Sequence, residues 1–375
     1  MSTHPELSEV SNTLQIDWYR CDIARDKLIA LLERSDAQGW WLVLGHLALF
    51  SCTALAVVYS FQQAMWVTLA CALFAHGTVT SFFPVSPVHE LGHGTVFKTP
   101  VLNRVFLRVF SLIGWWNHYE YAMSHTYHHR YTLHPIGDRE VVLPRYPSLE
   151  LSYLVQLFTF NVFGGTESTG FFPKVVNTVR TALGGYRKDK GDWFKALYDG
   201  YPQERRRAVL WARYILAFHS SVLLASYLLE LWMLPVVLTL PVFTANALRY
   251  FVGMPMHCGL RSNVPDFRQC VRSIELDPIS EFLYWHMNWH TEHHMFAAVP
   301  CYQLAKLHRT VQAQMPAPRT LIGAWREMRE SWRRQQIEPS YEFDTPIPVS
   351  ADTSAREHDV LADSIGDLAP STLRE

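Results

Sequence analysis

The chain has 375 residues, of which 49% are hydrophobic, 14% aromatic and only 18% charged, below the roughly 25% charged residues of a typical soluble domain. Its 33 basic and 34 acidic residues give a formal net charge of −1, so no basic excess points to a nucleic-acid partner. The six cysteines form no C-x-x-C pair, which argues against a zinc ribbon or a disulfide framework, whereas histidine is abundant, with 18 residues.

Four apolar runs have the length of about 20 residues that a helix needs to cross a bilayer. They follow a polar segment that lacks the apolar stretch of a secretory signal, and they cover 40–61, 64–85, about 208–229 and about 231–252. We expect two hairpins, because the tips near Gln62 and Glu230 carry no lysine or arginine. The positive-inside rule then places both termini and the long middle segment in the cytoplasm. The blander alternative is that some of these runs are core helices of a soluble protein.

The remaining segments suit a helical cap on the cytoplasmic side. Residues 101–116 and 151–163 read as helices lying in the membrane interface, and 184–207 as a charged, solvated stretch. Residues 302–315 and 321–335 read as amphipathic helices. The sequence therefore predicts an all-α integral membrane protein with four transmembrane helices in two hairpins. Its predicted parts are an N-terminal cytoplasmic segment, a membrane and catalytic domain, a C-terminal amphipathic region and a disordered acidic tail, at 1–39, 40–310, 311–341 and 342–375.

Histidines concentrate in three clusters on the predicted cytoplasmic side. The first reads H-E-L-G-H and follows the second apolar run, the second reads H-T-Y-H-H in the middle segment, and the third reads H-T-E-H-H after the fourth run. On a helix, positions i, i+3 and i+4 share one face, so each cluster can aim its imidazoles at one point. One metal ion cannot use so many imidazoles, which favours two, although neutral imidazole suits several metals alike. The predicted ligands, which are also the predicted catalytic residues, are His89, His93, His125, His128, His129, His290, His293 and His294.

These three boxes, with apolar runs paired before and between them, resemble the membrane-bound fatty-acid desaturase and hydroxylase superfamily. The resemblance implies a non-haem centre of two iron ions, held by the eight histidines, that activates O₂ with electrons from a carrier protein. It further implies a lipid or fatty-acyl-like substrate. His257, in the sequence G-M-P-M-H, matches a further family ligand by position only. No H-P-G-G of a fused cytochrome is present, which favours a separate donor of the ferredoxin or cytochrome type.

Ligating histidines usually donate their second ring nitrogen to an acceptor. Six acids are plausible acceptors, with Glu292 the best placed: Glu90, Glu120, Asp138, Glu140, Asp277 and Glu292. Each of His118, His134, His286 and Asn288 is either a supporting partner or a structural residue. We expect neutral packing roles for His46, His76 and His219, and no role for His4, His308 and His358. Tryptophans near the boxes line a substrate tunnel or form an interfacial belt: Trp115, Trp116, Trp285 and Trp289.

Two other function classes remain open. The first box is literally H-E-x-x-H, the pattern of a zinc-dependent membrane metalloprotease with Glu90 as general base, but that reading leaves both H-x-x-H-H triplets without a purpose. A non-enzymatic membrane protein that binds or transports metal would carry its ligands within the spans. Within the oxygenase reading, desaturation and hydroxylation share the first hydrogen abstraction, and the substrate need not be a long acyl chain.

Overall fold

The computed structural model describes residues 4–143, 145–164 and 169–348. These are mostly helical, with one two-stranded parallel sheet formed by β1 (Ile274–Glu275) and β2 (Arg319–Thr320). The α-helices are α1 (Leu7–Thr13), α2 (Arg25–Leu31), α3 (Asp36–Gln62), α4 (Trp66–Ser81), α5 (Pro87–His93), α6 (Pro100–Ile113), α7 (His118–Tyr131), α8 (Leu151–Phe158), α9 (Phe171–Ala182), α10 (Gly191–Tyr198), α11 (Pro202–Leu228), α12 (Leu234–Leu238), α13 (Ala247–Gly253), α14 (Phe267–Cys270), α15 (Pro278–Leu283), α16 (His290–Met295), α17 (Leu304–Val311) and α18 (Leu321–Gln335). Short 3₁₀ helices are η2 (Pro241–Phe243), η3 (Met254–Met256), η4 (Cys301–Gln303) and η5 (Gln312–Gln314).

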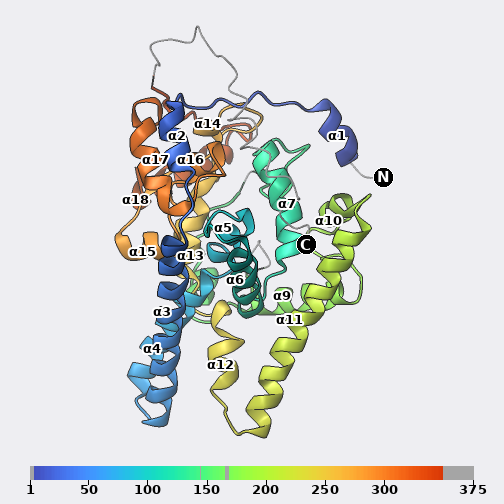
Figure 1. The fold of residues 1–375 in the computed structure, drawn as a ribbon, viewed down its shortest axis with the longest axis vertical. Helices are drawn as coiled ribbons and strands as arrows, with labels where there is room; N and C mark the ends of the chain where they lie inside the picture. The colour runs from blue at the N-terminus through green and yellow to red at the C-terminus, as the bar shows by residue number, and fades with distance from the viewer. Residues whose placement is uncertain (1–3, 144, 165–168, 349–375) are drawn as a thin grey trace.

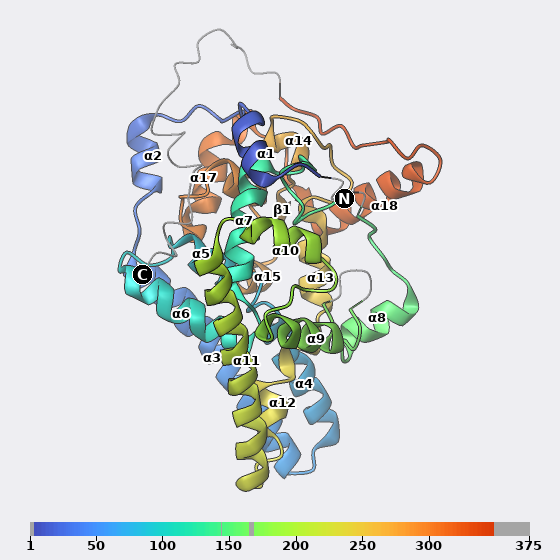
Figure 2. The same cartoon turned by 90° about the vertical axis from the view of Figure 1, so that its right-hand side faces the viewer.

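Helices α3, α4, α11 and α12 project together from one end of a wider helical body (Figure 1). The view turned by 90° shows α6, α8 and α9 at the level where these four helices leave the body (Figure 2). Helices α5, α7 and α16, which contain the three histidine boxes, belong to the body rather than to the projecting helices. The predicted metal ligands on these helices therefore lie outside the projecting helices α3, α4, α11 and α12.

Two helices are long and apolar enough to cross a membrane. Helices α3 and α11 have 27 residues each, and the side chain of Ser35 caps the first turn of α3 by accepting from Gln38 N. Only 22% and 33% of their most apolar windows are buried within the protein. A core helix of a soluble protein would be buried over most of its length, so the exposure of both helices favours lipid as their surroundings.

The second hairpin is not formed by two continuous helices, which corrects the expected span at 231–252. This run contains α12, η2 and α13, because Pro235 and Pro241 interrupt the backbone hydrogen bonds of a single helix. Between η2 and α13, Thr244 is extended and pairs with Phe160, and Ala245 has a positive φ of 50°. Helix α4 has 16 residues and lies so close that a Cβ on Gly77 would come within 2.4 Å of the Thr244 backbone oxygen. Four crossings therefore stay a prediction.

Two segments that were expected to be solvated or disordered pack against the protein. Within 184–207, helix α10 buries Trp193 and Phe194, because its apolar residues follow helical spacing among the charges. At the start of the acidic tail, Glu342 accepts a hydrogen bond from Ser262 N and Phe343 N donates to Gly259 O. The predicted tail beyond residue 348 lies outside the described residues.

Candidate metal centre

The first box forms helix α5. Pro87 occupies the first position of this helix, where the backbone has no intrahelical acceptor for an N–H group, so proline loses no hydrogen bond there. Gly94, with φ of +70°, ends the helix in the left-handed conformation. His89 and His93 are four residues apart and therefore share one face of this helix. Their rings lie 4.7 Å apart, measured between centroids.

The second and third boxes lie on α7 and α16. Helix α7 begins at Asn117, whose side chain accepts from Glu120 N, and it continues through His125 and His129 to Tyr131. Helix α16 begins at His290 itself, and its first turn is held by a hydrogen bond from Thr291 N to a serine hydroxyl. Both H-x-x-H-H patterns are therefore helical, as the spacing predicted.

The nine histidines of the predicted ligand set fall into two groups. In each group, one ring nitrogen per residue lies within 4.8 Å of all the others. The larger group combines the first box with parts of the other two: His89, His93, His125, His129 and His293. The smaller group is His128, His257, His290 and His294. His129 and His294 stack at 4.4 Å between ring centroids, so the two groups are neighbours.

Several ring nitrogens within each group face one another at short distance. In the larger group, His129 Nε2 lies 3.0 Å from His125 Nε2 and 3.2 Å from His293 Nε2. In the smaller group, His290 Nε2 lies 3.1 Å from the Nε2 of His257. Two nitrogens that bind one ion at about 2.1 Å each lie roughly 3 Å apart, so these distances would suit a shared ion. The convergent nitrogens thus have the spacing of ligands around a common ion.

Three of these histidines hydrogen-bond to a carboxyl group through Nδ1, the ring nitrogen on the side away from Nε2. His89 Nδ1 donates to Glu90 at 2.8 Å, and His125 Nδ1 donates to Glu140 at 2.9 Å. His128 Nδ1 donates to Asp138 at 2.8 Å. Each bond fixes the tautomer and leaves Nε2 with its lone pair, which is the form that binds metal.

Two further histidines use uncharged acceptors that the sequence did not reveal. His257 Nδ1 donates to the backbone oxygen of Cys270 at 3.1 Å, and His294 Nδ1 lies 3.1 Å from Thr132 Oγ1. Thr132 follows His128 by four residues and shares its helix face, so spacing offered a signal for it. The Cys270 carbonyl comes from a distant segment and offered none.

Burial keeps most of these imidazoles neutral. It lowers the pKa of His93 to about 3 and holds the pKa of His89 and His293 well below the usual range, with repulsion from neighbouring histidines adding to the effect. Burial also disfavours the charged form of His128, but the charge and hydrogen bond of Asp138 outweigh it and raise its pKa. A neutral imidazole is the form that ligates metal, so the burial prepares the site.

Glu292, which the sequence ranked first as an acceptor for a ligating histidine, has other partners. Glu292 is buried, and it accepts from Ser273 Oγ and from His308 Nδ1, both at 2.5 Å. His308 is therefore a buried structural partner, which corrects the expectation that it has no role. Glu120 accepts from Thr181, and Asp277 caps α15, so neither contacts a box histidine.

Residues that flank the boxes lie outside both histidine groups. His118 and His134 pack edge-on against tryptophan rings, at 4.4 and 5.4 Å between centroids. His286 lies 3.2 Å from the Glu281 carboxylate, and Asn288 donates to a backbone oxygen. These contacts favour the structural role for all four.

Histidines within the apolar runs are paired with neutral groups. His46 accepts from Trp285 Nε1 and lies 3.0 Å from a backbone oxygen, and His76 lies between Thr53 and another backbone oxygen. His219 has the same kind of partners. This is the neutral packing that the sequence predicted.

The sequence pattern of the fatty acid desaturase family matches residues 63–325, which is more than half of the chain. The chain belongs to the fatty acid desaturase family. The family confirms the predicted resemblance, and together with the two apolar helices it indicates a membrane protein with an oxidoreductase activity on lipid. No curated protein matches the chain. The zinc protease reading loses its support, because both H-x-x-H-H triplets join the H-E-x-x-H histidines in the two groups.

A cavity of about 610 Å³ in this desaturase-family protein reaches both histidine groups. Its wall includes His89 and His125 from the larger group and His290 from the smaller one. Trp115 and Trp116 also line it, in agreement with the tunnel alternative. The other two tryptophans of that prediction do not: Trp285 is fully buried, and Trp289 donates to Glu281.

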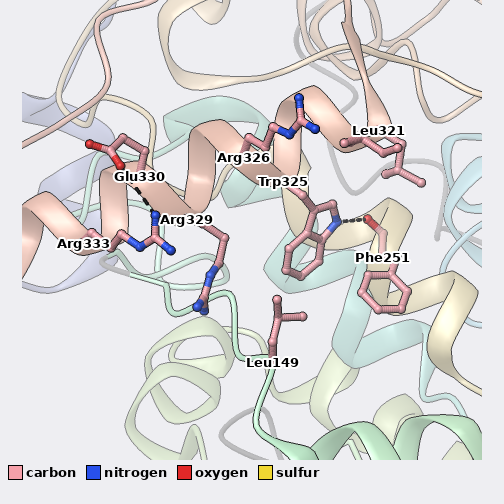
Figure 3. A pocket seen from close by; sticks show the side chains of 9 residues that line it. Leu149, Phe251, Leu321, Trp325, Arg326, Arg329, Glu330 and Arg333 are labelled. Carbon is pink, nitrogen blue, oxygen red and sulfur yellow. Dashed lines mark hydrogen bonds and ion pairs between the residues drawn. The ribbon is translucent and has the colours of Figure 1, made fainter.

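A second pocket, of about 660 Å³, lies beside α18 (Figure 3). Its lining includes Trp325, whose indole N–H donates to the backbone oxygen of Phe251. Three arginines of α18 also line it: Arg326, Arg329 and Arg333. Its described lining contains no histidine or cysteine, so this pocket is separate from the candidate metal centre.

Proposed function

We propose that the protein is an O₂-dependent membrane oxidoreductase with two iron ions, which desaturates or hydroxylates an unactivated C–H bond of a lipid or fatty-acyl-like substrate. The observation that carries the proposal is the division of nine histidines, seven of them buried and two half-buried, into two adjacent groups of five and four. The family supplies the reaction class. The proposed metal ligands are these nine histidines, and the proposed catalytic residues are the eight of the three boxes, without His257.

The donor atoms fit two redox metals. Among the described residues, His89 Nε2 and His93 Nε2 are buried without a hydrogen-bond partner, as expected for nitrogens reserved for a metal. A set made only of imidazoles suits iron, copper, nickel and zinc, but zinc has no second oxidation state. When bound, iron supplies the O₂ activation and the electron transfer that protein side chains cannot perform.

The chain's own residues orient the ligands and shape the site. Asp138 and Glu140 hold His128 and His125 in one tautomer, and Glu90 does the same for His89. Burial raises the pKa of Glu90 to about 8, which favours its protonated form at neutral pH; a protonated carboxyl group still accepts a hydrogen bond through its carbonyl oxygen. The aromatic and methionine side chains along the cavity exclude water from an apolar substrate.

The proposed arrangement in the membrane follows the sequence. Both termini and the active site face the cytoplasm, and four spans anchor the domain at 40–310. Segments 1–39 and 311–341 flank this domain, and the acidic tail 342–375 follows. Electrons come from a separate ferredoxin or cytochrome. All lysines and arginines except Arg213 and Arg249 lie outside the four apolar runs, and none lies in the two hairpin tips, which supports this orientation.

The test is expression of the chain with and without His293→Ala, followed by mass spectrometry of cellular lipids and metabolites. We expect products lighter by two hydrogens or heavier by one oxygen with the wild-type chain alone. Purified protein should contain two iron ions per chain and consume O₂ with a reduced carrier. Identical profiles for both proteins, or one zinc ion per chain, would refute the proposal.

A further inference from the structure

Helix α9 carries its polar side chains inwards and its apolar side chains outwards. Four polar residues with i, i+3, i+4 and i+7 spacing line the cavity: Lys174, Asn177, Thr178 and Thr181. The exposed residues are mostly apolar, with 54%, 48% and 38% of the surface of Phe172, Val176 and Val179 accessible and 81% of that of Leu183, which directly follows the helix. Arg180, in the last turn, is also exposed. A helix on the surface of a soluble protein has the opposite arrangement. Helix α9 therefore fits a position with lipid outside and a polar ligand or water inside.

Most polar groups of this inner wall are already satisfied by one another. The Asn177 amide donates to Asp189 at 3.0 Å and accepts from Lys188 N at 2.9 Å. Arg187 makes two hydrogen bonds to Asp189, at 3.1 and 2.7 Å. Thr181 donates to Glu120 at 3.0 Å. These groups form a fixed frame and leave few sites for a ligand.

The Lys174 ammonium is the exception in this wall. Its nitrogen lies 3.8 Å from the centroid of the Trp116 ring, and in the described part of the chain no oxygen accepts from it. Burial lowers the pKa of Lys174 to about 7, with Arg187 and Arg249 adding to the effect and Asp189 and Glu120 opposing it. The Lys174 amine is therefore only partly protonated at neutral pH, and an anion bound beside it in the cavity would favour its charged form.

Basic side chains outnumber acids in the described lining of the cavity. It contains five basic residues, Arg145, Lys174, Arg187, Lys190 and Arg249, and three acids, Glu120, Glu140 and Asp189. Each acid already has a partner on the protein. A cavity of about 610 Å³ is of the size that encloses one small ligand, roughly 300–1,000 Å³. It is too small for a whole diacyl lipid.

We propose that Lys174 binds the carboxylate of a single-chain amphiphile and holds its chain against the histidine groups, so that the substrate is a free acid rather than an ester. This inference rests on the proposed function for its chemical step but not for the binding itself, because Lys174 is not among the proposed metal ligands. The Trp116 ring lies against the ammonium, and the carboxylate accepts hydrogen bonds from it.

The test is a competition assay on the purified full-length protein. Radiolabelled dodecanoate is bound to the detergent-solubilised protein and displaced by unlabelled dodecanoate or by its methyl ester, which has the same chain but an uncharged head with one added methyl group. We expect the acid to compete at least tenfold better than the ester. Lys174→Met should weaken dodecanoate binding at least tenfold and abolish the difference between acid and ester. Lys195→Met is the matched control, because Lys195 is exposed on α10, outside the cavity lining, and should bind as the wild type does.

The wild-type comparison needs no substitution, so the proposal stays testable even if Lys174→Met fails to fold. Equal competition by acid and ester, or unchanged binding in a folded Lys174→Met protein, would overturn it. The proposed function fails separately, in iron content and O₂ consumption. A protein that prefers the acid but holds no iron would retain this inference and lose the proposed function.

Discussion

The substitution Asp138→Asn tests how a buried carboxylate supports the candidate metal centre. Asp138 is 1% exposed and accepts four hydrogen bonds, from His128 Nδ1 at 2.8 Å and from the backbone N–H groups of Leu133, Glu140 and Val141 at 3.0, 2.9 and 3.4 Å. Both oxygens face donors, so either orientation of an asparagine amide points its NH₂ at an N–H group. That conflict costs about 1–3 kcal/mol.

The loss is expected mainly in the smaller histidine group. Removing the charge that faces His128 Nδ1 weakens His128 as a ligand, and loss of such a supporting partner typically lowers metal affinity by roughly 10- to 100-fold, about 1.4–2.8 kcal/mol. His128 belongs to the group of four, so Asp138→Asn should lower the metal content from two ions per chain towards one. The measurement is iron per chain after dialysis against a series of buffered free-iron concentrations.

Asp277→Asn is the matched control, because sequence alone ranked both aspartates as possible acceptors. Asp277 caps α15 by accepting from Ile279 N and Ser280 N, and asparagine caps a helix equally well. This variant should keep both ions. Two ions of unchanged affinity in Asp138→Asn, or an equal loss in both variants, would refute the reasoning.

Three further substitutions test other parts of the structure. His308→Ala leaves the buried Glu292 without one of its two close partners, so the protein should lose about 1–3 kcal/mol of stability and its melting temperature should fall. The iron content should stay unchanged. A variant that loses iron but keeps its melting temperature would contradict this role. Lys174→Met should raise the melting temperature at pH 7 in the absence of ligand, because the lysine pKa is lowered on folding and the unfolded chain binds more protons. That gain should shrink as the pH rises towards 10, and a gain independent of pH would be evidence against a buried ammonium. Gly77→Ala should lower the yield and the melting temperature, since the new Cβ would come within 2.4 Å of the Thr244 oxygen; a variant as stable as the wild type would show that α4 can move away.

Features that depend on local periodicity could be predicted from the sequence. The H-x-x-H-H pattern is helical in both α7 and α16, because i, i+3 and i+4 positions share a helix face wherever the helix lies. The apolar length of α3 and α11 is equally local, and so is the amphipathic pattern of α18, whose bounds agree with the expected 321–335. The same holds for Asp138 and Glu140, which follow their histidines closely in the chain.

Features that depend on contacts between distant segments required the tertiary structure. The division of the nine histidines into five and four mixes all three boxes, and no spacing specifies which ring faces which neighbour. Glu292 was expected to support a histidine of its own box, but its partner His308 comes from α17. The fourth apolar run breaks where Thr244 pairs with Phe160, a contact with a segment about 80 residues earlier in the chain.

The sequence by itself determined the family, the ligand residues that we propose and the presence of two long apolar helices, because these follow from residue type and helical spacing. Both helices begin earlier than expected, at Asp36 and Pro202. Only the tertiary structure decided which acids hold which imidazoles and where the fourth run breaks. It also decided that Lys174 lies in the cavity without an acceptor for its ammonium among the described residues. The physical reason is that burial and hydrogen bonding are properties of a side chain's neighbours, and here those neighbours come from far along the chain.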